Sequence, residues 1–142
     1  MNLTDIMDIA ASGLSAQRVR MAAAASNLAN VHTTRGPDGG PYRRRDPVFA
    51  AEPLGGQQFG STLRHAMRRV SVRGVEIDAR PPLMHHDPGH PDADAKGMVA
   101  TPRVDTVEEI VNVMSASRSF EANLVILRKV REMSDAAMQI GR

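Results

Sequence analysis

The chain has 142 residues, no cysteine, no tryptophan and a formal net charge of +2. Without cysteine it forms neither a disulfide framework nor a thiolate metal site, and its charges are spread evenly instead of gathering into the basic patch typical of nucleic-acid binding. No stretch reaches the roughly 18 apolar residues of a membrane span, and we expect no cleavable signal peptide, because the N-terminus lacks its basic and apolar regions.

Residues 3–29 predict a long helix. Its apolar and small residues recur in alternating steps of four and three, which defines a heptad seam. The seam positions are Leu3, Met7, Ala10, Leu14, Gln17, Met21, Ala24, Leu28 and Val31. Two compatible interpretations of Met7, Leu14 and Met21 stay open, an ordinary core and a seam between subunits.

Short strands and loops are predicted for the middle of the chain. Residues 36–41 are a dense turn signal of glycine and proline, without the glycine spacing of a phosphate-binding loop. Residues 42–51 predict an extended segment, 55–58 a loop, and 70–77 a strand with a bulge. Residues 43–45 are three consecutive arginines, which we interpret as a solvated face, with phosphate binding as the alternative.

Residues 81–97 contain the candidate metal ligands, and no regular element is predicted there. The side chains considered are His85, His86, Asp87, His90, Asp92 and Asp94. A metal site needs three or four ligands that converge from rigid elements with a supporting shell, whereas Pro88, Gly89 and Pro91 interrupt this stretch. We therefore expect turn chemistry here, with no metal and no cofactor.

The sequence carries no signature of an enzyme. Neither His32 nor His65 lies in a recognisable nucleophile–base arrangement, and no GxSxG elbow or pair of carboxylates on a pocket-forming element occurs. We expect no catalytic residues and no small-molecule substrate.

Residues 105–140 predict a second, longer helix of roughly 54 Å at 1.5 Å per residue. Asp105 and Glu108 form a capping-box arrangement at its start. A single apolar stripe is predicted at Val107, Ile110, Met114, Ser117, Phe120, Leu124, Leu127, Val130, Met133, Ala137 and Ile140. A stripe of this length needs a partner along the whole helix.

The predicted fold is mainly α with a small β and loop middle. The long N- and C-terminal helices pair as a coiled-coil-like hairpin, and a short β-rich segment lies between them. We expect residues 1–31 and 104–142 to form a terminal helical domain and residues 32–103 a small middle domain. Two paired helices leave much apolar surface exposed, so the pattern favours a self-assembling structural subunit over a catalyst.

Several stretches resemble known proteins. Residues 12–17, 20–21 and 27–30 resemble the N-terminal motif of bacterial flagellar axial proteins, the family of rod, hook and hook-associated subunits. Residues 36–43, 88–94, 104–105 and 114–123 are similar to the proximal-rod branch of that family. The resemblance covers nearly the whole chain but is weak over residues 50–68.

The resemblance implies a structural subunit of the flagellar basal-body rod, the drive shaft that spans the periplasm and transmits torque. It implies export without a cleavable signal through the flagellar type III apparatus. The implied partners are copies of the chain, other rod subunits and the adaptor between the rod and the export gate, with no nucleic acid. The alternative is a homo-oligomeric coiled-coil adaptor with no flagellar role.

On this basis we expect the assembly interface to lie on the terminal helices. Its packing residues would be Leu14, Met21, Leu28, Met114, Phe120, Leu124 and Leu127, and its register-fixing amides would be Gln17, Asn27, Asn30 and Asn123. The asparagines also have a simpler interpretation as caps or solvated residues, which is the better one for Asn30.

Overall fold

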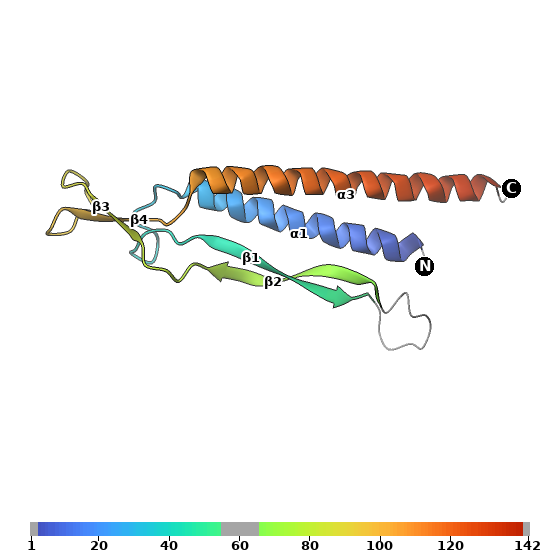
Figure 1. Ribbon diagram of the computed structural model, residues 1–142, viewed down its shortest axis with the longest axis horizontal. Helices are drawn as coiled ribbons and strands as arrows, with labels where there is room; N and C mark the ends of the chain where they lie inside the picture. The colour runs from blue at the N-terminus through green and yellow to red at the C-terminus, as the bar shows by residue number, and fades with distance from the viewer. Residues whose placement is uncertain (1–2, 55–65, 141–142) are drawn as a thin grey trace. The chain divides into compact units, whose positions relative to one another are not determined.

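A computed structural model describes residues 3–54 and 66–140 of the chain (Figure 1). Its elements are α1 (Leu3–Ala29), β1 (Arg45–Pro53), β2 (Arg68–Ile77), β3 (Leu83–His86), β4 (Met98–Thr101) and α3 (Thr106–Ile140). Strand β1 pairs with β2, and β3 pairs with β4, which gives two separate two-stranded sheets. The predicted loop at residues 55–58 lies outside the described residues.

The two terminal helices pack together, with the small hairpins between them in the sequence (Figure 1, α1 in blue and α3 in orange to red). This confirms the predicted fold class. The predicted cap of α3 is also present, because Oδ1 of Asp105 accepts hydrogen bonds from the N–H groups of Val107 at 2.8 Å and Glu108 at 3.2 Å. Neither described helix is long and apolar enough to cross a membrane.

The described residues divide into two compact units, and both terminal helices contribute to each. Unit one is drawn from residues 1–19, 48–74 and 115–142, and unit two from residues 20–47 and 75–114. The functional division expected from the sequence, terminal helices against a middle segment, remains a prediction.

Small side chains form the helix contact in unit one. Ala10 and Ala16 of α1 are buried, as are Ala116 and Val130 of α3. At Gly13, α1 lies close to α3, since a Cβ atom placed on Gly13 would lie 3.0 Å from Nδ2 of Asn123. Helices that meet through such residues lie close together and need little apolar volume between them.

The seam of α1 therefore differs from the predicted one. Met7 belongs to the predicted seam, but its side chain is 41% exposed. Leu14 and Met21 are partly buried, while Ala10 and Ala24 of the predicted seam are buried, as is Ala16 outside it. The heptad spacing is correct, but the contact runs through alanine and glycine, which contribute little to a hydrophobic pattern.

The single apolar stripe predicted on α3 is correct at Phe120, Leu127 and Val130, which are covered, and wrong at other positions. Its Val107, Met114 and Met133 are exposed. The covered face repeats every four and three residues and shares only part of the predicted set, at Glu109, Val113, Ala116, Phe120, Asn123, Leu127, Val130 and Ser134. Small and polar residues share this face with Val113, Phe120, Leu127 and Val130, and further large apolar side chains are left on a second, exposed face of the helix.

Strand β3 is a regular element where none was predicted. Leu83 pairs with Thr101 and His86 with Met98 in an antiparallel register, and the N–H of Asp87 donates to the carbonyl of Gly97 at 2.9 Å. Four exposed residues carry no alternating pattern, so only the pairing with β4, more than ten residues away, specifies this strand.

We predict that replacing Gly13 by leucine destabilises the helix pair. A larger side chain at this position must displace Asn123, and overpacking of this kind costs about 1–3 kcal/mol. The matched control is Ala11→Leu, which adds the same side chain at an exposed position of α1 and is expected to change stability by less than about 0.5 kcal/mol. Thermal unfolding followed by circular dichroism measures both, and equal midpoints would contradict the close contact at Gly13.

Candidate functional site

Asn27 organises unit two through its side-chain amide. Oδ1 accepts a hydrogen bond from the N–H of Arg45 at 2.9 Å, and Nδ2 donates to the carbonyl of the same residue at 3.0 Å. Oδ1 also accepts from the hydroxyl of Tyr42 at 2.8 Å. The amide thus binds both backbone groups of Arg45, the first residue of β1, as a neighbouring strand would. Only 1% of Asn27 is exposed.

Tyr42 adds a second tie to α1. Its hydroxyl lies 3.3 Å from that of Ser26, one residue before Asn27. The guanidinium of Arg45 lies over the tyrosine ring, 5.7 Å from the centroid, at a distance typical of a cation–π contact. The single tyrosine of the chain therefore connects helix, loop and strand.

A buried ion pair holds the start of α3. Nε of Arg44 donates to Oε1 of Glu109 at 2.6 Å, and its Nη2 donates to Glu108 at 2.8 Å. Glu109 is 1% exposed. Burial alone would lower the pKa of Arg44, but its hydrogen bond with Glu109 and the charges of Asp46, Glu109 and Glu108 together raise that pKa above its ordinary value.

These contacts correct the interpretation of residues 43–45. Arg43 and Arg45 are exposed, as expected for a solvated face, but Arg44 is largely buried. Sequence reasoning missed Arg44, Tyr42 and Glu109 as site residues, because their partners are distant in the sequence. In the sequence, only Glu109 pointed to this site, because it is a charged residue in the first turn of α3 at a position that is usually apolar.

The residues expected to form an assembly interface occupy different environments. Leu14, Gln17, Met21, Leu28, Asn30, Phe120, Asn123 and Leu127 are partly buried, Asn27 is buried, and Met114 and Leu124 are exposed. Asn27 is engaged within its own chain. Nδ2 of Asn30 donates to the carbonyl of Ser26 at 2.8 Å, as expected of a residue at the end of a helix.

Gln17 is the exception among these amides. Its Oε1 is buried, and no hydrogen-bond partner for it exists among the described residues. An unpaired buried carbonyl costs about 1–3 kcal/mol. The seam of unit one therefore contains a destabilising group as well as favourable contacts.

His85 and His86 lie in β3, whereas Asp87, His90 and Asp94 accept hydrogen bonds within the turn that follows. Nδ1 of His90 accepts from the N–H of Asp92, whose carboxylate accepts from the hydroxyl of Thr34 at 2.8 Å and pairs with Arg35 at 3.3 Å. Within the ranges that the structure covers, no three His, Asp or Glu side chains converge in a way that could hold a metal ion.

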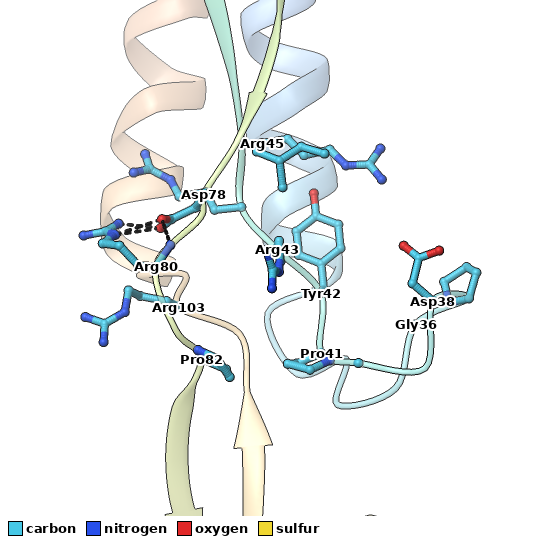
Figure 2. Close-up of a pocket in the computed structure, with 14 residues that line it drawn as sticks. Gly36, Asp38, Pro41, Tyr42, Arg43, Arg45, Asp78, Arg80, Pro82 and Arg103 are labelled. Carbon is cyan, nitrogen blue, oxygen red and sulfur yellow. Dashed lines mark hydrogen bonds and ion pairs between the residues drawn. The ribbon is translucent and has the colours of Figure 1, made fainter.

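The other prominent feature of unit two is a hollow of about 430 Å³ beside β1 and β2. Figure 2 shows Arg43 between the ring of Tyr42 and the ion pair of Arg80 with Asp78. That pair is short, at 2.6 Å, and hydrogen bonds from Arg80 hold the pKa of Asp78 at about 2. No catalytic arrangement accompanies these groups, because the arginines bind carboxylates or face solvent.

Comparison with known proteins assigns these helices to recognised families. Residues 7–37 match the family described as flagella basal body rod protein, and residues 95–140 match the flagellar basal body rod FlgEFG protein C-terminal family. The chain is 43% identical to the flagellar basal-body rod protein FlgC of Salmonella typhimurium, over the full length of both. It is 38% identical to FlgC of Borreliella burgdorferi, covering 99% of this chain and 98% of the relative. It is 35% identical to FlgC of Bacillus subtilis, covering 96% of each.

We predict that Asn27→Ala destabilises the fold by about 1–3 kcal/mol, because it leaves the backbone of Arg45 and the hydroxyl of Tyr42 without their buried partner. Chemical denaturation of the purified chain measures the change. Asn30→Ala is the control, since its amide bonds lie at a more exposed helix end; a loss as large as that of Asn27→Ala would contradict the central place of Asn27.

We predict that the Asp78 carboxyl titrates with a midpoint of about 2 instead of its ordinary 3.8. Because the folded pKa is depressed, the stabilising contribution of this pair is complete above pH 3.8 and is lost as the pH falls through about 2. Carboxyl chemical shifts followed by NMR report the midpoint. Arg80→Ala should return it toward 3.8, and an unchanged midpoint in that variant would show that Arg80 is not the cause.

Proposed function

The chain belongs to the FlgC family of flagellar basal-body rod proteins and is a structural, non-enzymatic component of the rod, and we propose that it assembles with neighbouring subunits through the exposed apolar face of α3. Family membership decides against an adaptor with no flagellar role. It implies assembly with rod subunits.

The observation that carries the proposal is the second face of α3. In unit two, Val107, Ile110, Val111 and Met114 lie three or four residues apart along the helix, and all are exposed. Side chains at this spacing form one continuous strip on a helix surface. A strip of four large apolar side chains facing water is typical of a surface that another protein covers.

The same face continues in the part of α3 that belongs to unit one. Val125, five whole turns after Val107, is exposed there, Leu124 is exposed between this face and the covered one, and Met133 follows toward the end of the helix. The covered face of the helix, at Phe120 and Leu127, meets the rest of the unit. One helix thus offers two surfaces, and we assign the covered one to the chain itself and the exposed one to neighbours.

The remaining interface residues belong to the margin of the helix pair. Leu14, Met21 and Leu28 are partly buried on α1, so each keeps surface that a neighbour can cover while it packs within the chain. We assign Gln17 and Asn123 to register, because amides at a seam favour the one alignment that satisfies them. Asn27 and Asn30 we assign to holding the end of α1.

This assignment extends to the domains and the wider assembly. Residues 1–31 and 104–142 would form the wall of the rod, and residues 32–103 would pack outside it. The partners would be copies of the chain, other rod subunits and the adaptor between rod and export gate. We propose export through the flagellar type III apparatus to the periplasmic rod, and long helices with an exposed apolar face are compatible with it, because assembly would supply their missing burial.

We predict that Met114→Asp abolishes incorporation into the rod and motility while the purified chain keeps its fold, because Met114 is 50% exposed on the assembly face. Met84→Asp is the matched control, since Met84 is 53% exposed but lies on β3. Swimming assays, together with detection of the chain in isolated basal bodies, measure both. Normal motility of the Met114 variant, or equal loss in both variants, would contradict the assignment of α3.

A further inference from the structure

The hollow of unit two lies at the base of the β3–β4 hairpin. Two of its lining residues, Pro82 and Arg103, directly precede β3 and closely follow β4. Pro41 and Tyr42 line it from the loop before β1. In Figure 2 the two strands of the hairpin leave from the lower edge of this site, while Arg43 lies near its middle.

Three of the five arginines that line the hollow form no direct ion pair with a carboxylate among the described residues, although the charge of Arg103 helps to lower the pKa of Asp78. Arg44 pairs with Glu109 and Arg80 with Asp78. The other three are Arg43, Arg45 and Arg103, for which the described contacts are the ring of Tyr42 beneath Arg45 and the carbonyl of Pro81 near Arg103. A hollow walled by proline and tyrosine, with unpaired guanidinium groups, fits a carboxylate-bearing segment, because guanidinium forks bind carboxylates in pairs of hydrogen bonds.

A segment of that chemistry lies at the other end of the same hairpin. The turn of residues 87–97 contains three aspartates and one lysine. Asp87 and Asp94 are exposed, and each accepts its described hydrogen bonds through Oδ1 alone, from backbone N–H groups of the turn. Their Oδ2 atoms have no partner among the described residues. Asp92 differs, because it is already paired with Arg35.

The turn cannot reach the hollow of its own chain. The four paired residues of β3, from Leu83 to His86, hold the turn roughly 13 Å from the base of the hairpin at about 3.3 Å per residue. The ladder with β4 fixes that separation, and Gly97 at φ +71° closes the turn tightly against Pro88. A contact between acidic turn and arginine hollow therefore needs two copies.

We propose that the acidic turn of residues 87–97 in one copy docks into the arginine-lined hollow of a second copy, with Asp87 and Asp94 meeting Arg43 and its neighbours. The two surfaces are different, so one contact leaves the turn of one copy and the hollow of the other free, and a head-to-tail contact of this kind can add further subunits. This inference rests on the proposed function, to which it adds a second, electrostatic contact outside the helices.

Disulfide cross-linking tests the contact directly, because the chain contains no cysteine of its own. Asp38→Cys places a thiol on the wall of the hollow, and Ala95→Cys places one in the turn without removing an aspartate. When chains with Asp38→Cys and chains with Ala95→Cys are mixed in assembled rods and oxidised, we expect a cross-linked dimer. Its yield should be several-fold above that of the control pair, Asp38→Cys with Ala122→Cys, in which the second cysteine is at an exposed position of α3. Equal or absent cross-linking in assembled rods would overturn the proposal.

Charge reversal separates this contact from the helix assignment. Arg43→Glu with Arg103→Glu, and separately Asp87→Arg with Asp94→Arg, should each reduce incorporation by about tenfold through like-charge repulsion, and co-expression of the two double variants should restore it. Full incorporation of either double variant alone overturns the head-to-tail contact and leaves the helix assignment intact. If both double variants lose incorporation and co-expression does not restore it, the head-to-tail contact is also overturned. The helix assignment is judged separately, by the comparison of Met114→Asp with Met84→Asp.

Discussion

The hydrogen bonds of Asn27 are the interaction on which unit two depends. A single amide, 1% exposed, binds both backbone groups of Arg45 and the hydroxyl of Tyr42. With the ion pair of Arg44 and Glu109, it joins the end of α1, the entry of β1 and the start of α3. Buried polar groups of this kind specify one arrangement, because every other arrangement leaves them unpaired.

The thin core explains why polar contacts carry so much of the structure. Of the six fully buried hydrophobic side chains among the described residues, four are alanines, at Ala10, Ala16, Ala24 and Ala116. Alanine seams bring helices close but remove little apolar surface from water. Large apolar residues are exposed on α3 and also on β1, β2 and β3, and we propose that those on α3 are covered when the chain assembles with other rod subunits.

How much of the fold the sequence predicts depends on how far apart in the chain the interacting residues are. The two helices, the Asp105 cap and the turn at residues 36–41 depend on neighbours within a few positions, and the sequence predicts them correctly. The polar cluster does not follow from local pattern, since Arg44 and Glu109 are 65 positions apart. The stripe predicted on α3 includes covered residues such as Phe120 and Leu127 but also the exposed Val107, because a hydrophobic pattern cannot distinguish apolar side chains that pack within the chain from those that stay exposed.

The most direct test of this account is a reconstruction of an intact basal body at a resolution that shows side chains. We expect Val111, Met114 and Val125 to be covered by other subunits, while Asn27 keeps its bonds to Arg45 within the chain. A rod in which this face of α3 meets solvent, or in which Asn27 contacts a neighbour instead of Arg45, would contradict the division between the two helix faces.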